Sequence, residues 1–170
     1  MATELYDLTV PVFTRALKAL SGLLDKAVAH AGEAGAQALL SNRLIDDMHP
    51  LAKQVQIACD SAKLCVARLS GAEAPVNEDT ETTIAELNAR IAATLAFIAS
   101  VPRGEIDGQE GREVVLKFPG GELPFRGLAY VTGFALPNFF FHVSMAYALL
   151  RQAGVPLGKR DYMGAALTGG

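Results

Sequence analysis

The feature that most constrains the fold is a long stretch without charged side chains, residues 127–150. It is as long as a membrane-spanning helix, for which about 20 apolar residues suffice. It nevertheless contains Pro137, Asn138 and His142, which a lone span in lipid would leave without neighbouring helices to satisfy them. Every other apolar stretch is interrupted by charges at helical spacing. We therefore predict a core helix, outside any membrane and covered by other helices on nearly all sides.

Two segments in the first half of the chain carry an apolar stripe that can cover this helix. Residues 4–31 repeat apolar side chains at helical spacing, and the glycines at positions 32 and 35 predict the end of that helix. Residues 50–71 open with a proline and close with a glycine, as helices commonly do. The stripe of this second helix is rich in Ala and Cys, which lets a neighbouring helix approach closely.

A third helix and a hairpin are predicted between these segments and the uncharged stretch. The helix ends before Pro102, and Asp79 or Thr80 is expected to cap its start. In residues 112–127 the apolar period changes to two around the turn "PGG", which indicates a short β-hairpin. Because so small a hairpin is not stable alone, we expect it to lie against the helices.

These elements together predict an all-α fold in a single domain, residues 1–170. The expected architecture is a four-helix bundle with one long crossover connection and a small β-hairpin between helices 3 and 4. A hydrophobic fraction of 51% without tryptophan is typical of closely packed helices. The acidic residues 77–81 and the stretch 158–162 are expected to be solvent-exposed connectors.

The charge and the cysteine content limit the kinds of binding partner and the cellular compartment that we expect for this protein. The formal net charge is −3, and lysines and arginines gather in nothing larger than pairs, so we expect neither a nucleic-acid surface nor a membrane-binding patch. Cys59 and Cys65 lie six residues apart on one predicted helix, on different faces, and cannot bridge each other. With no export signal at the N-terminus, this predicts a reducing cytoplasm.

Asn138 and His142 are spaced four apart and share one face of the predicted fourth helix. One interpretation is structural, because a buried imidazole and a buried amide satisfy each other and fix the helix register. The other interpretation is a functional site. No nucleophile elbow, zinc-protease motif or phosphate-binding loop occurs in the sequence.

Several stretches resemble a bacterial and fungal family of unassigned function, which is placed with the DinB/YfiT-like four-helix bundles. The stretches are "DMHPLAKQVQIACDSAK", "ALPNFFFHV" and "GVPLGKRDY", and the similarity covers nearly the whole chain. The resemblance implies a DinB-like bundle. The wider superfamily includes metal-dependent transferases and isomerases that use small thiols, and their metal is held by one histidine of the second helix and an HxxxH pair of the fourth.

The resemblance implies only part of such a metal site in this chain. The second histidine of the pair falls on His142, but the first falls on Asn138 and the second-helix position falls on Gln54. Amide oxygens are poorer ligands for zinc or nickel than imidazole. His49 is the one histidine near the second-helix position and, with His142, the remaining metal-ligand candidate. We therefore expect no cofactor, with zinc or nickel as the alternative, and a pocket of Gln54, Asn138 and His142 suited to a polar small molecule.

Two functions from different classes remain open at this point. The first is a non-catalytic or small-ligand-binding bundle with a degenerate metal site. The second is a metal- or thiol-dependent transferase or isomerase in which His142 acts as base or ligand. A homodimer is also expected, since residues 139–141 are three consecutive phenylalanines that cannot all point into one core.

Overall fold

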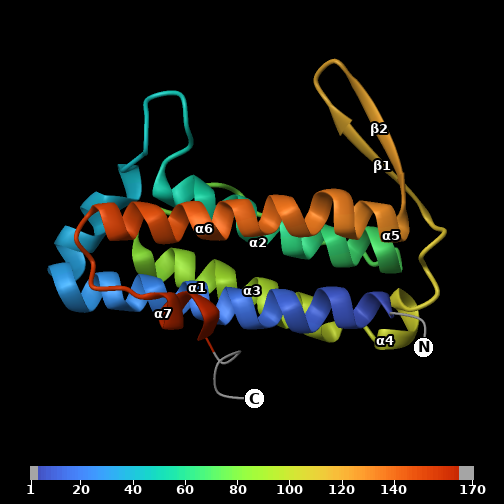
Figure 1. Cartoon of the computed structure of the whole chain (residues 1–170), viewed down its shortest axis with the longest axis horizontal. Coiled ribbons are helices and arrows are strands. Elements are labelled where there is room, and N and C mark those ends of the chain that lie inside the picture. The colour runs from blue at the N-terminus through green and yellow to red at the C-terminus, as the bar shows by residue number, and fades with distance from the viewer. Residues whose placement is uncertain (1–3, 165–170) are drawn as a thin grey trace.

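Four long helices lie side by side in the computed structural model, which describes residues 4–164 (Figure 1). The elements in chain order are α1 (Leu5–Ala38), a 3₁₀ turn (Leu39–Ser41), α2 (Leu51–Ser70), α3 (Ile84–Ser100), α4 (Arg103–Ile106), β1 (Glu113–Phe118), β2 (Gly121–Arg126), α5 (Gly127–Tyr130), a π-helical turn (Val131–Ala135), α6 (Leu136–Gln152) and α7 (Lys159–Met163). The predicted bundle with a hairpin between its third and fourth long helices is confirmed.

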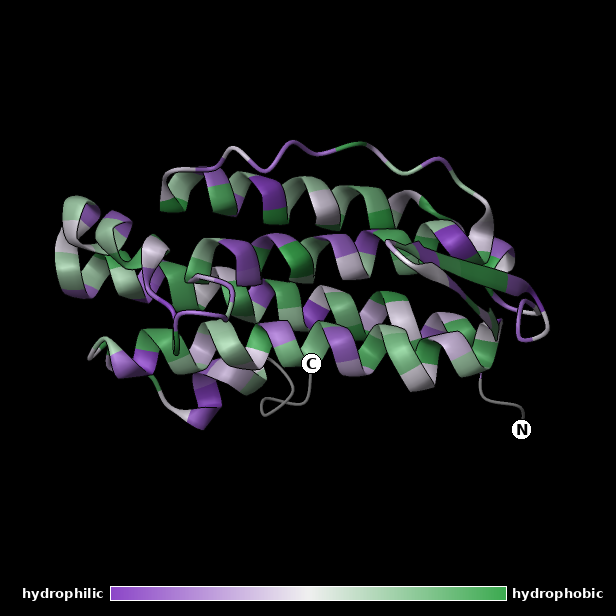
Figure 2. Ribbon diagram, turned by 90° about the horizontal axis from the view of Figure 1, so that it is seen from above, coloured by the Kyte–Doolittle hydropathy of each residue, from purple (hydrophilic) through white to green (hydrophobic). Residues whose placement is uncertain are grey.

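The long crossover connects α2 to α3. These two helices run in the same direction, opposite to α1 and α6 (Figure 1). Residues 71–83 therefore return along the length of the bundle as an extended segment, which Figure 2 shows beside the helices. This segment is the one long connection that the sequence predicts.

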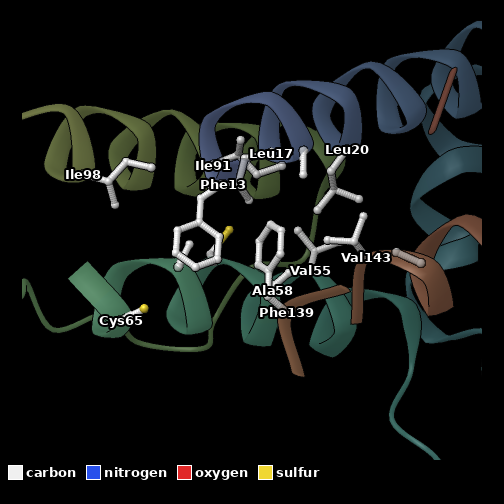
Figure 3. Close-up of a cluster of buried hydrophobic side chains, with 14 of the residues drawn as sticks. Phe13, Leu17, Leu20, Val55, Ala58, Cys65, Ile91, Ile98, Phe139 and Val143 are labelled. Atoms are coloured by element: carbon white, nitrogen blue, oxygen red, sulfur yellow. The ribbon is translucent and has the colours of Figure 1, made fainter. Parts of the chain in front are cut away.

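The core is built from the apolar stripes of all four long helices (Figure 3). Phe13 of α1 meets Phe139 of α6 edge to face, with ring centroids 4.8 Å apart. Ala58 of α2 and Ile91 of α3 lie in the same cluster and are almost completely buried. Small residues on α2 leave room for these aromatic rings, which explains why the Ala-rich stripe packs so closely.

Three helix ends differ from or refine the prediction. The first helix does break at Gly32, where φ is 70°, but it resumes and continues to Ala38. The second ends at Gly71 in the left-handed conformation, as expected. The third is capped by Thr83, whose side chain accepts the Glu86 amide in a capping box, so the prediction of Asp79 or Thr80 is wrong.

The uncharged stretch forms α5, the π-helical turn and α6 in one continuous rod, Gly127–Gln152. By length and composition alone this rod is apolar enough to cross a membrane, as are many core helices of soluble proteins. The prediction that it is buried on nearly all sides is wrong. One face packs on α1 and α2, while Leu128 is 41% and Phe141 is 51% exposed on the outer side.

The hairpin extends from the end of the bundle where α5 begins (Figure 1). Its strands pair antiparallel around a two-residue turn, with Leu116 opposite Leu123. Val114 and Leu116 are buried against the bundle, whereas Phe118 and Leu123 project farther out and stay about half exposed. The apolar face of the hairpin thus begins inside the core and continues beyond it.

The stretch 158–162 is not a free connector. It forms most of α7, which packs on α1. Lys26 forms an ion pair with Asp161, 2.6 Å between Nζ and Oδ1, and Tyr162 meets Tyr147 edge to face. The C-terminal part of the described chain is therefore folded back onto the first helix.

Both cysteines are buried in α2, and they do not bridge each other, as predicted. Burial raises the pKa of Cys59 and that of Cys65 to about 12. Both side chains are consequently protonated at neutral pH and act as small apolar core groups.

Candidate functional site

The structure brings two of the three predicted pocket residues together. Gln54 on α2 and His142 on α6 face each other, with 2.7 Å between Gln54 Oε1 and His142 Nδ1. The Gln54 amide nitrogen donates in turn to the backbone carbonyl of His49, at 3.0 Å. This chain of hydrogen bonds ties the start of α2 to the middle of α6 inside the bundle.

The same contacts determine which nitrogen of His142 carries the proton. A backbone carbonyl can only accept, so the Gln54 amide nitrogen must face His49 and its oxygen must face the imidazole. His142 Nδ1 is therefore the donor, and its Nε2 keeps a lone pair in the neutral ring. Burial, and to a smaller degree the nearby charge of His49, lowers the pKa of His142 to about 4. The ring is neutral at physiological pH.

Asn138 belongs to a different contact. Its side-chain nitrogen donates to Ser61 Oγ at 2.8 Å, and Ser61 donates to the carbonyl of Ile57 at 2.7 Å. Asn138 and His142 thus lie on one helix face, as predicted, but each contacts a different residue of α2.

The three positions do not fit a metal ion. His142 offers one ligand atom, the free Nε2, because its Nδ1 is bonded to Gln54, and the Asn138 amide is turned to Ser61. His49, the other candidate ligand, has an exposed side chain and takes part only through its backbone oxygen. Across residues 4–164, no group of three or more His, Cys, Asp or Glu side chains is arranged to hold a metal.

A cavity of about 440 Å³ lies beside the Asn138–Ser61 contact, between α2, the hairpin and the α5–α6 rod. Its walls are largely apolar and include Ile57, Leu64, Leu116, Phe118, Leu123 and Phe134. Asn138 and Ser61 form part of its lining, whereas His142 is 7% exposed and does not line it. No sequence pattern predicts this cavity, because it depends on where the hairpin lies relative to α2.

Arg68 and Tyr130 bring polar atoms to the same cavity. Arg68 Nη1 donates to the Tyr130 hydroxyl at 2.8 Å. Tyr130 is 1% exposed, and burial raises the pKa of its hydroxyl to about 12. The neutral phenol therefore holds the guanidinium in place at the cavity wall. Neither residue was predicted, because two side chains so far apart in the sequence show no shared motif.

The π-helical turn shapes the wall opposite α2. Its residues Phe134 and Ala135 line the cavity. The Leu136 amide bonds to the carbonyl of Val131, five residues earlier, immediately before Pro137. Because proline has no amide hydrogen, it interrupts the α-helical ladder at this point. A proline inside the uncharged stretch was the one sequence signal for this wide turn, a feature that often occurs at functional sites.

Another polar group of the lining, Asp60, is held by a network of charges. Its carboxylate pairs with Lys63 at 2.9 Å and with Arg90 of α3 at 3.0 Å. Arg90, whose side chain is 3% exposed, also pairs with Asp79 and Glu81 of the crossover segment. Residues 78–80 are exposed in a connecting segment, as predicted, but the carboxylates of Asp79 and Glu81 are tied to Arg90.

Comparisons with known proteins agree with this architecture. The model of a family described as a domain of unknown function, DUF1993, matches residues 5–163. The chain is also similar to a solved structure of a DinB family member protein from Shewanella denitrificans. The two share 40% sequence identity with a TM-score of 0.84, over 95% of this chain and 92% of the other. No curated protein matches the sequence.

Proposed function

Because the chain belongs to the DUF1993 family and shares the fold of a DinB family protein, we propose that it is a small-molecule-binding helical bundle. The ligand site is the cavity between α2, the hairpin and the α5–α6 rod. In this proposal the Gln54–His142 pair is the remnant of a metal site and now serves the bundle as a hydrogen-bonded support.

The observation that carries the proposal is the composition of the cavity. The cavity measures about 440 Å³ and has largely apolar walls, and a few polar groups, among them Asn138, Ser61 and Arg68, converge on it. Pockets for small molecules combine a largely apolar lining with a few placed polar groups, at volumes of roughly 300 to 1,000 Å³. The cavity meets both criteria.

A neutral fluorescent probe, 1-N-phenylnaphthylamine, tests the proposal. We expect it to bind wild-type protein with one-to-one stoichiometry and an increase in fluorescence. Leu64→Trp places an indole in the cavity and should abolish binding. Leu95→Trp is the matched control, since Leu95 is also a half-buried leucine but lies on α3, outside the cavity lining. Equal binding by both variants would contradict the proposed site.

The alternative function, a transferase or isomerase that uses His142, has less support. The imidazole is buried and does not line the cavity, and its Nδ1 donates a hydrogen bond to Gln54. Turnover of a thiol adduct by wild-type protein that is lost in His142→Ala would favour the enzyme.

We also propose that a second copy of the chain covers the outer face of the α5–α6 rod. Residues 127–150 carry no charge, yet Leu128 and Phe141 are about half exposed there. Exposed apolar faces of this kind often mark association surfaces, and two identical uncharged faces bury no unpaired charge when they meet. Light scattering should give a dimeric mass for wild-type protein at micromolar concentration and a monomeric mass for Phe141→Glu. A monomeric wild type would overturn this proposal.

A further inference from the structure

We infer that the ligand of the cavity is an organic monocarboxylate with an elongated apolar body, and that its carboxylate binds Arg68. This inference rests on the proposed function, because it assigns a ligand class to the same cavity. It depends on three features: the contacts of the Arg68 guanidinium, the other charged side chains of the cavity lining, and the direction in which the cavity runs.

Arg68 is a half-buried cation with spare donors. Among residues 4–164 it forms no ion pair, and its one side-chain hydrogen bond goes to the Tyr130 hydroxyl at 2.8 Å. A guanidinium has five N–H donors in a planar fork that matches a carboxylate. Tyr130 therefore orients the fork while leaving most of its donors for an anion.

The other charges near the cavity favour a single negative charge on the ligand. Asp60 also lines the cavity, although its carboxylate is paired with Lys63 and Arg90. Lys117 is the second cation of the lining, but its side chain is 78% exposed and lies 3.4 Å from Glu122. One guanidinium thus faces the ligand, and it matches the single charge of a carboxylate, whereas the second charge of a phosphate monoester would have no buried cation of the lining to pair with.

The cavity runs along α2 and gives the ligand a direction. Ile57, Ser61, Leu64 and Arg68 follow one another on the same helix face. At 1.5 Å per residue, the distance from Ile57 to Arg68 is about 16 Å along the helix axis. A carboxylate at Arg68 therefore places an apolar chain over Leu64, toward Ile57. Phe118 and Leu123 of the hairpin cover it from the other side.

Displacement of 1-N-phenylnaphthylamine by matched eight-carbon ligands tests this assignment. At pH 7.5 we expect octanoate to displace the probe from wild-type protein at a concentration about tenfold lower than neutral octanamide requires, a factor equal to one charge-assisted interaction of about 1.4 kcal/mol. Octyl phosphate should be weaker than octanoate. In Arg68→Gln the ratio of octanoate to octanamide should fall to about one while probe affinity is retained.

Two further variants separate orientation and general charge from the role of Arg68. Tyr130→Phe removes the hydroxyl that orients the guanidinium and should reduce the octanoate preference without abolishing it. Lys117→Gln removes the exposed cation of the same cavity and should leave the preference unchanged. Retained probe binding in each variant shows that the cavity is folded.

The possible failures are distinguishable. Equal displacement by octanoate and octanamide, or an octanoate preference that persists in Arg68→Gln, overturns the carboxylate assignment and leaves the proposed function in place. If octyl phosphate binds more tightly than octanoate, the inference that the ligand carries a single negative charge is wrong. Calorimetry with octanoate is run alongside, and if neither octanoate nor the probe binds wild-type protein, both the ligand class and the proposed function are wrong.

Discussion

His142 Nδ1 lies 2.7 Å from Gln54 Oε1, so α6 and α2 share a hydrogen bond inside the bundle. Removing the imidazole leaves a cavity and leaves Gln54 Oε1 without its hydrogen-bond donor. We therefore expect His142→Ala to lower the free energy of unfolding by about 2 to 4 kcal/mol. Urea denaturation measures this, with His30→Ala as the control because His30 is exposed on α1. A loss below about 1 kcal/mol, the range of surface substitutions, would contradict a structural role.

The same residue should also make stability depend on pH. Its pKa in the folded protein is about 4, below the 6.5 expected when unfolded, so the unfolded chain takes up the proton first as pH falls. The contribution of His142 is complete above about pH 6.5 and is lost progressively toward pH 4, by about 3 kcal/mol at most. The loss of stability between pH 7 and pH 4 should therefore be smaller in His142→Gln than in wild-type protein. An identical loss in both would contradict the lowered pKa.

The metal content of the purified protein distinguishes a metal site that has been lost from one that still binds metal through ligands not identified above. After exposure to zinc, nickel and manganese followed by desalting, we expect wild-type protein to retain far less than one equivalent of metal by plasma mass spectrometry. The double variant Gln54→His/Asn138→His places three imidazoles at the positions that the family resemblance indicates and should bind zinc. Stoichiometric metal in wild-type protein that is lost in His142→Ala would contradict this and favour the enzyme.

Arg90 should be a major support of the crossover. It is the shared partner of Asp60, Asp79 and Glu81, and Arg90→Met leaves these three carboxylates close together. Because two of them are partly exposed, we expect a loss of about 2 to 4 kcal/mol rather than the full cost of breaking a buried ion pair.

Hydrogen exchange should localise this effect. The amides of Thr82 and Thr83, which donate to Glu86 where the crossover joins α3, are expected to lose protection in Arg90→Met before those of α6. Arg15→Met, at an exposed position of α1, is the control. Uniform loss of protection across the chain would show that the network has no special connection to the crossover.

Two glycines of the α5–α6 rod should respond oppositely to alanine. A Cβ at Gly127 would lie 2.1 Å from the carbonyl oxygen of Gln109, so the backbone must shift, and we expect a loss of about 1 to 3 kcal/mol. At Gly133 a Cβ meets open space, and alanine should be neutral or stabilise the helix by up to about 1 kcal/mol. Thermal unfolding of both variants measures the contrast. Similar melting temperatures would contradict the close approach at Gly127.

Local patterns predicted the long elements well. The alternating apolar residues and the "PGG" turn were enough for the hairpin, and Gly71 marked the end of α2. The short helices α4 and α7 were missed because four or five residues show no helical period. The cap of α3 was misplaced since several acceptors precede this helix, and the sequence does not show that Asp79 is drawn to Arg90 instead.

The candidate site was predictable only in part. The resemblance to a family with a metal motif was sufficient to choose Gln54 and His142, which do meet. Asn138 was placed on the correct helix face, but its turn toward Ser61 depends on side-chain packing between α2 and α6. The Arg68–Tyr130 pair depends on the position of the rod relative to α2, which no local pattern encodes.

The burial of Cys59 and Cys65 gives the protein a built-in reporter of its own opening. Both thiols are fully enclosed in α2 and protonated at neutral pH, so a maleimide dye cannot react with the closed bundle. Cys59 lies in the middle of α2 and borders α3, with Arg90 and Thr94 beside it, whereas Cys65 lies near Arg68 in the C-terminal part of the helix. The rates at which the two sites become labelled would therefore show whether the middle or the C-terminal part of α2 separates first from its neighbours.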